Sequence, residues 1–130
     1  MDILQPAGWA RPRGYSNGVA ARGRQVHVAG QIGWADGARW EADDFAGQFA
    51  QALRNVVAVC AEAGAGPEHL VRLTWFVTSL AEYRAAGAAI GAAYREIMGR
   101  HYPAMTVVEV SGLVEPGAKI EIEATAVVPD

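Results

Sequence analysis

The sequence predicts an α+β protein in which two amphipathic helices cover one face of a mixed β-sheet. Two stretches place apolar residues at helical spacing, and several shorter stretches are rich in alternating or β-branched residues. In chain order these segments predict the pattern β-β-(β)-α-β-α-β-β. No shift in composition, repeat or linker divides the 130 residues, so we expect a single domain that spans residues 1–130.

The N-terminal part of the chain predicts strands and turns. Residues 6–14 have the composition of an irregular lead-in. Residues 25–30 alternate polar and apolar side chains and predict a strand. A shorter strand over residues 16–21 is expected to pair with it through a turn at residues 22–24. Asp36-Gly37 is a turn signal, from which we expect a further hairpin arm.

Two helices are predicted by their apolar stripes and end signals. The first is expected to begin at Asp43 and to end at Gly64. Ser79 and Glu82 have the spacing of a capping box, so a second helix is expected from there to Gly99. The stripes consist of Phe45, Phe49, Leu53, Val56, Val57 and Cys60 in the first helix, and Tyr83, Ala86, Ile90, Tyr94 and Ile97 in the second.

Three further strands are expected, over residues 70–78, 106–110 and 119–128. The last two are joined by a turn at residues 115–117, with proline second and glycine third. Both faces of the first strand carry apolar residues, since Trp75 and Phe76 point to opposite sides. The sequence predicts no layer that could cover the face opposite the helices. We therefore expect a homo-oligomer whose interface includes this helix-free face.

Composition excludes several classes of protein. Hydrophobic residues make up 52% of the chain and charged residues 19%, which is the balance of a folded domain. No apolar run is long enough to cross a bilayer, and the N-terminus lacks the basic and apolar regions of a signal peptide, so no membrane partner and a cytoplasmic location are expected. The net charge of −3, with no basic cluster, disfavours a nucleic-acid partner.

The sequence has no pattern of a metal or cofactor site, and neither group is expected. The histidines, His27, His69 and His101, do not have the spacing of metal ligands. The single cysteine, Cys60, falls on the apolar stripe of a helix and is interpreted as core packing. The four tryptophans are open to two interpretations, as the lining of a pocket or as packing in the core or at an interface.

Glu121 and Glu123 are the informative acids, because they share one face of a strand that is otherwise rich in apolar residues. This pattern indicates either a solvated face or a buried site in which a carboxylate transfers protons. The pattern alone leaves both interpretations open.

Six segments, in order and at matching spacing, resemble the RidA/YjgF family, also known as L-PSP endoribonuclease-like proteins. They are residues 14–18 (GYSNG), 28–33 (VAGQIG), 48–56 (QFAQALRNV), 103–104 (PA), 108–110 (VEV) and 120–126 (IEIEATA). The resemblance extends from about residue 15 to residue 128. It implies a chorismate-mutase-like α+β fold and a homotrimer with ligand clefts between its subunits.

Active members of this family hydrolyse reactive enamines and imines, such as 2-aminoacrylate, to a carbonyl compound and ammonia. They need no metal or organic cofactor. The resemblance therefore implies that Glu121 holds or activates water and that Tyr15 contacts the substrate as the second catalytic residue. The substrate-binding positions that it implies are Gly30, Gln31, Met105 and Thr106.

Two positions depart from the family pattern. After the Pro-Ala pair the family has an arginine that grips the substrate carboxylate, whereas Met105 has no charge and no hydrogen-bond donor. Ala88 stands where the family has a helix asparagine. We therefore expect a deaminating hydrolase whose substrate differs from the small carboxylates of the family. Its recognised end is expected to be uncharged, bulkier or apolar.

The same departure supports a rival hypothesis: a trimeric module that binds small molecules or protects proteins and has no catalytic activity. In both cases the expected partner is a small molecule in a cleft between subunits. A third interpretation, an endoribonuclease, follows only from the family's older name. It is disfavoured by the absence of a basic patch and of a histidine pair that could cleave a phosphodiester.

Overall fold

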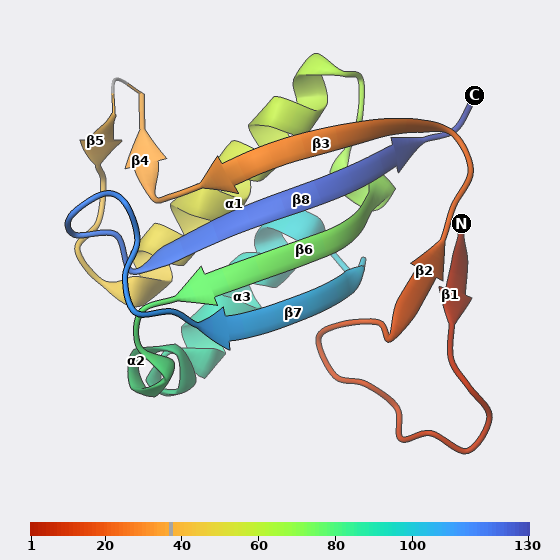
Figure 1. Cartoon of the computed structure of the whole chain (residues 1–130), viewed down its shortest axis with the longest axis horizontal. Coiled ribbons are helices and arrows are strands. Elements are labelled where there is room, and N and C mark those ends of the chain that lie inside the picture. The colour runs from red at the N-terminus through yellow and green to blue at the C-terminus, as the bar shows by residue number, and fades with distance from the viewer. Residues whose placement is uncertain (37) are drawn as a thin grey trace.

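Four strands form a mixed sheet with the long helices on one side (Figure 1). They are β3 (Arg24–Gln31), β6 (Leu70–Val77), β7 (Ala104–Glu109) and β8 (Ile120–Val128), in the order β3-β8-β6-β7. β8 runs antiparallel to both of its neighbours, whereas β6 and β7 are parallel. The computed structural model describes residues 1–36 and 38–130, and it confirms the predicted α+β class.

The helices confirm the predicted stripes, with one difference. α1 spans Phe45–Glu62 and is followed by a 3₁₀ turn at Pro67–His69. The predicted second helix is two helices, α2 (Leu80–Ala85) and α3 (Gly87–Met98), which meet at Ala86 with a ψ of 8°. The glycine after Ala86 favours this break, because glycine is a poor helix former. Among the described residues, no helix has both the length and the apolar character needed to cross a membrane.

The core lies between the sheet and the helices α1 and α3. Its largest members from the strands are Leu70, Leu73, Trp75, Val77, Ile120 and Ile122, and those from the helices include Phe49, Leu53, Val56, Cys60, Ile90 and Tyr94. The helical members of this core are the stripe residues that the sequence predicted. The interpretation of Cys60 as core packing is confirmed, and burial raises the pKa of its thiol.

The N-terminal strands differ from the prediction. β2 (Gly18–Ala20) pairs with β1 (Asp2–Leu4), a strand that was not predicted, and not with β3. Gly23 explains the difference, because its φ of 147° turns the chain around the end of β8, where a side chain would overlap the Val128 carbonyl. The β1–β2 hairpin therefore projects beside the end of the sheet (Figure 1).

β4 (Trp34–Ala35) and β5 (Arg39–Trp40) form the hairpin arm that was expected around Asp36. Trp34 packs edge-on against Trp40 across this arm, with ring centroids 5.9 Å apart. The predicted turn at Asp36-Gly37 falls partly on residue 37, which lies outside the described residues.

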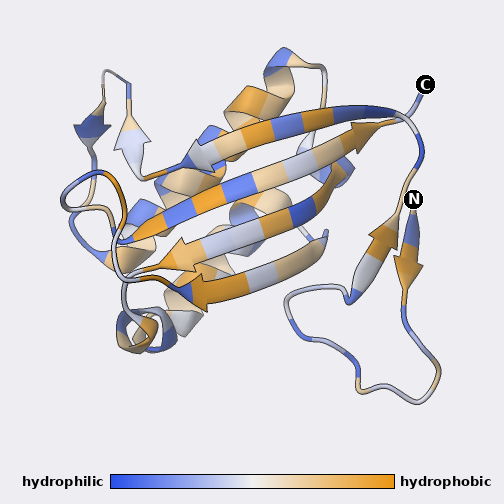
Figure 2. Ribbon diagram, viewed as in Figure 1, coloured by the Kyte–Doolittle hydropathy of each residue, from blue (hydrophilic) through white to orange (hydrophobic). Residues whose placement is uncertain are grey.

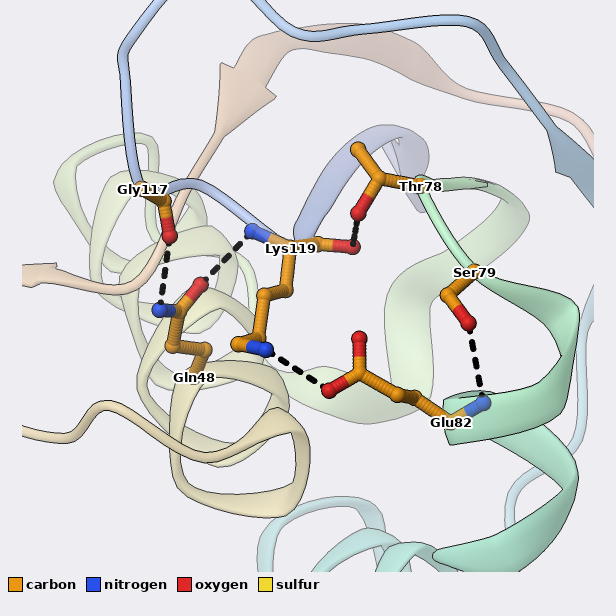
Figure 3. A network of polar contacts seen from close by, with 6 residues as sticks. All are labelled: Gln48, Thr78, Ser79, Glu82, Gly117 and Lys119. Atoms are coloured by element: carbon orange, nitrogen blue, oxygen red, sulfur yellow. Dashed lines mark hydrogen bonds and ion pairs between the residues drawn. The ribbon is translucent and has the colours of Figure 1, made fainter.

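A network of polar contacts fastens the start of β8 to α1 and α2 (Figure 3). Gln48 of α1 is buried; its Oε1 accepts from the Lys119 N–H at 2.8 Å and its Nε2 donates to the Gly117 carbonyl at 3.0 Å. Lys119 Nζ lies 2.6 Å from Glu82 Oε1. Ser79 caps α2 as predicted, by accepting from the Glu82 N–H at 3.1 Å. These bonds hold the predicted Pro-Gly turn before β8, in which Gly117 has a φ of 89°.

The face of the sheet opposite the helices is uncovered in the single chain. Phe76 of β6 and Val108 of β7 lie side by side on this face. Figure 2 shows hydrophilic and hydrophobic residues alternating along β8, so that this strand gives the sheet one apolar face and one mixed face. Glu123 is exposed on the mixed face and Glu121 is half-buried.

Candidate functional site

A cavity of about 500 Å³ opens between the end of β3, the outer side of α1 and the loop before β8. We call it the first cavity; its lining includes Gly30, Gln31, Trp34, Asn55, Glu115 and Glu121. Its volume falls in the range of small-molecule sites. Three of the residues expected at the site, Gly30, Gln31 and Glu121, therefore lie together.

Glu121 reaches the first cavity because position 30 has no side chain. A Cβ at Gly30 would overlap the Glu121 carboxylate and would lie 2.9 Å from its Cγ. The pairing of β3 with β8 is irregular between Val28 and Gln31, and such a bulge changes the direction of the strand. The glycine and the bulge together place the carboxylate over the backbone of β3.

Asn55 builds the wall of the first cavity that belongs to α1. Its Nδ2 donates to the carbonyls of Ile32 at 3.0 Å and Trp34 at 2.7 Å. Its Oδ1 accepts from Gln51 Nε2 at 2.9 Å. These bonds hold the loop after β3 against the helix, so Asn55 is a positioning residue that was not among those expected at the site. The sequence signal for it was an asparagine in mid-helix, where this residue is disfavoured.

The first cavity is acidic. Asp36, Glu115 and Glu121 line it, and no lysine or arginine of the described chain does so. The Trp34 indole also lines it, and its buried Nε1 meets no acceptor among the described residues. Carboxylates beside an aromatic ring favour a neutral or positively charged group, because they repel a negatively charged one.

Met105 lies in a different cavity. This second cavity, of about 340 Å³, lies between α2, α3, the start of β7 and the segment before β2. Its aromatic lining consists of Trp75, Tyr83, Tyr94 and Tyr102. Burial, and to a lesser degree the neighbouring Tyr102, raises the pKa of Tyr94, whose hydroxyl donates to the His101 carbonyl at 2.6 Å. The phenol of Tyr94 therefore acts as a neutral wall residue.

Tyr15 and Thr106 lie outside the linings of both cavities. Tyr15 is 38% exposed on the segment before β2. Ser16 holds this segment against the start of β7, since its N–H donates to the Pro103 carbonyl at 3.0 Å and its hydroxyl donates to the Tyr102 carbonyl. Thr106 is exposed on the helix-free face. Within one protomer the expected site residues are therefore divided, with Glu121 and Met105 in separate cavities.

Two of the histidines make local structural contacts. His69 Nδ1 accepts from the Gly66 N–H at 2.9 Å, and His101 Nε2 lies 2.6 Å from the Leu70 carbonyl oxygen. His27 is exposed on β3. Within residues 1–36 and 38–130, no three potential ligands gather into a group that could hold a metal ion.

The mixed sheet, its helical layer and the cavities at its two sides define the class: an α+β protein with the RidA/YjgF fold. The family model for endoribonuclease L-PSP matches residues 9–128, so the chain belongs to the RidA/YjgF family. The RutC family protein slr0709 of Synechocystis is 33% identical to it over 132 residues, which cover 99% of this chain and 98% of that protein.

The solved structures similar to this chain over almost its whole length include two that are more than a quarter identical. The Rid family protein YyfB from Yersinia pestis is 34% identical, with a TM-score of 0.83 and coverage of 98% of both chains. Escherichia coli TdcF with bound serine is 30% identical, with a TM-score of 0.69, and the match covers 98% of this chain and 99% of that one.

Proposed function

We propose that this protein hydrolyses a reactive enamine or imine to a carbonyl compound and ammonia, in a cleft between the subunits of a homotrimer. The observation that carries the proposal is the Glu121 carboxylate, held over Gly30 in the first cavity. An enamine becomes a protonated imine when its carbon takes up a proton. Water then adds to the C=N carbon while Glu121 accepts a proton from it. Glu121 returns that proton to the nitrogen, and the C–N bond breaks as the new hydroxyl group loses its proton, so protonated imine and water give a carbonyl compound, ammonia and one proton.

The acidic character of the first cavity supports this chemistry. An imine reacts with water when its nitrogen carries a proton, and the resulting cation is favoured beside carboxylates. Asp36 and Glu115 line the same cavity as Glu121. Their charges favour the cationic form of the substrate over the neutral one.

The separation of the expected site residues supports a cleft built from two protomers. The uncovered sheet face and exposed apolar side chains supply surface for such an assembly; Ile3 is 55% exposed, Trp9 62% and Val108 39%. When copies of the chain associate, the first cavity of one protomer can face Tyr15 and Met105 of another. TdcF, the 30% identical relative, has bound serine in its solved structure, which supports a small amino-acid-like ligand for this fold.

Met105 supports a change of substrate. A methionine cannot form the bidentate pair that an arginine makes with a carboxylate. Its half-buried side chain packs against the core beside Tyr102 and Tyr83. We therefore expect the recognised end of the substrate to be larger and more apolar than that of 2-aminoacrylate.

The test is ammonia release from a panel of imines and enamines, with 2-aminoacrylate among the carboxylated members and esterified analogues among the uncharged ones. Glu121→Gln should lower turnover of the best substrate by about 100-fold, since it removes a proton acceptor. Glu123→Gln is the matched control, because Glu123 lies on the same strand and the same face outside the first cavity. Full turnover by Glu121→Gln would refute the role of Glu121.

The second candidate is a binding module without catalytic activity, and Met105 is the observation that favours it. This candidate predicts that no member of the panel releases ammonia, and that Met105→Arg gains hydrolysis of 2-aminoacrylate. An endoribonuclease is disfavoured, because two of the histidines are engaged in structural contacts. Salt-sensitive RNA binding and cleavage by the purified protein would revive it.

A further inference from the structure

We propose that the second cavity binds a planar aromatic acid, with its ring among the aromatic side chains and its acidic group on the arginines at the rim. This inference rests on the proposed function and deepens it, because it names the part of the substrate that the protein recognises beside Met105. Binding is measured without turnover, so the two proposals can fail separately.

Aromatic rings form much of the wall of the second cavity. The Trp75 ring centroid lies 6.4 Å from those of Tyr83 and Tyr94. Tyr94 stacks on Tyr102 at 5.2 Å, with the two planes 6° apart. Met105 adds a polarizable thioether. Such walls favour a flat ring over an extended aliphatic chain, because ring faces and edges pack in defined stacked or T-shaped pairs.

Two glycines of α3 keep the cavity open. Gly87 and Gly91 lie four residues apart, on one face of the helix, and both line the cavity. A Cβ at Gly87 would meet no atom within 4 Å, and one at Gly91 would meet only Arg95 Nη1, at 3.3 Å. Glycine in a helix is destabilising relative to alanine, and no close contact of the fold requires it here. Gly87 also lies at the break between α2 and α3, whereas Gly91 lies inside α3, so the space itself is what Gly91 preserves.

Arg13, Arg84 and Arg95 bring positive charge to the second cavity from three different elements. None of the three forms an ion pair with a described residue, and no aspartate or glutamate of the described chain lines the cavity. Three like charges around one opening repel one another, and an anion relieves that repulsion. Guanidinium groups also bind carboxylates through two parallel hydrogen bonds. The positive charge that Met105 lacks is thus present at the rim of the same cavity.

The two cavities have opposite character, and in the proposed cleft between protomers this contrast would orient a ligand that reached from the first cavity of one protomer to the second cavity of another. The first cavity has carboxylates and no basic residue, whereas the second has arginines and no acidic one, among the residues that the structure describes. A substrate with an imine at one end and an aromatic acid at the other matches both. Its reacting nitrogen would lie near Glu121 and its acid near the helices.

The test is calorimetric titration of the full chain with trans-cinnamate, trans-cinnamamide and hexanoate. Cinnamate should bind at least about 10-fold more tightly than either, because the amide lacks the charge and hexanoate lacks the ring. Equal binding of cinnamamide or hexanoate would overturn the proposal. So would failure of cinnamate to bind at millimolar concentration.

Variants locate the binding. Arg84→Gln with Arg95→Gln should weaken cinnamate binding by at least about 10-fold. Arg22→Gln with Arg100→Gln is the control, because it makes the same change in net charge at exposed arginines outside the cavity. Equal weakening of cinnamate binding in both double variants would contradict the proposed role of the arginines at the rim. Glu121→Gln should keep cinnamate binding even where it abolishes hydrolysis, which separates this site from the proposed reaction.

Discussion

At Gly30 the absence of a side chain makes room for the Glu121 carboxylate. We predict that Gly30→Ala displaces this flexible side chain and lowers turnover by about 100-fold, as a displacement of about 1 Å in a reacting group can do. Thermal stability should change little, because the overlapping atoms belong to the end of a movable side chain. Gly112→Ala is the control, since a Cβ there meets no atom within 4 Å. Unchanged turnover in Gly30→Ala would mean that the carboxylate position is not critical.

Cys60 is a probe of the core, because it is the single cysteine and is fully buried. Burial raises the pKa of its thiol, and only the thiolate reacts with disulfide reagents. We predict that labelling at pH 8 is at least about 100-fold slower in the native protein than in concentrated urea, where the core is open. Because the raised pKa keeps the thiol protonated in the folded state, Cys60 contributes less to stability as the pH rises above about 8.5. Fast labelling of the native protein would contradict this burial.

Among the elements, α1 and β8 depend on Gln48 for their connection. We predict that Gln48→Leu lowers the free energy of unfolding by about 2 kcal/mol, because it leaves the Lys119 N–H and the Gly117 carbonyl without their partner. Urea titration of the variant measures this loss. Gln51→Leu, one turn later in the same helix, should cost within about 0.5 kcal/mol, since its bond is to another side chain, Asn55. Equal losses in both variants would show that the network of Figure 3 adds no special stability.

The elements that the sequence predicted correctly are those whose residues carry a period. The alternation of β8 and the stripe of α1 identify their buried faces, because burial has the same period as the side chains. The break at Ala86 was missed, since the stripe runs across it without a change of face. The partner of β2 was also missed, because a turn that pairs two strands and a turn that leads away from a sheet have the same composition around Gly23.

Residues of the candidate site could be predicted only where the residue type itself indicates a chemical role. Glu121 stood out as an acid in an apolar strand, and it does line a cavity. The grouping of Gly30 with Glu121 came from the family resemblance, and the structure adds the overlap that explains the glycine. The arginines of the second cavity were not expected, because Arg13, Arg84 and Arg95 come together only in the fold. Exposed side chains that come together only in the folded chain do not recur at a regular spacing, so the sequence does not predict their grouping.

At the scale of the whole molecule, the division of the expected site residues between two cavities supports the proposed homotrimer. The first cavity holds Gly30 and Glu121, whereas Met105 lines the second and Tyr15 lies near it on the same N-terminal segment as Arg13. A trimer of the 13.8 kDa chain has a mass of about 41 kDa. Light scattering of the purified protein measures this mass directly. Val108→Glu should reduce it, because the change puts a charge on the uncovered sheet face.

The last prediction tests whether each cleft takes residues from two protomers. Glu121→Gln and Tyr15→Ala should each have strongly reduced turnover alone, by about 100-fold for Glu121→Gln, yet equal amounts refolded together should recover about one quarter of wild-type turnover. In a shared cleft Glu121 comes from one protomer and Tyr15 from another. Half of the protomers have a wild-type residue at each of these positions, so about one cleft in four has both wild-type residues. The matched control is wild type refolded with the double variant Glu121→Gln/Tyr15→Ala. It should give about one quarter for a shared cleft, but about one half for a site within one protomer. No recovery in the first mixture, together with one half in the second, would place the whole reaction inside a single chain.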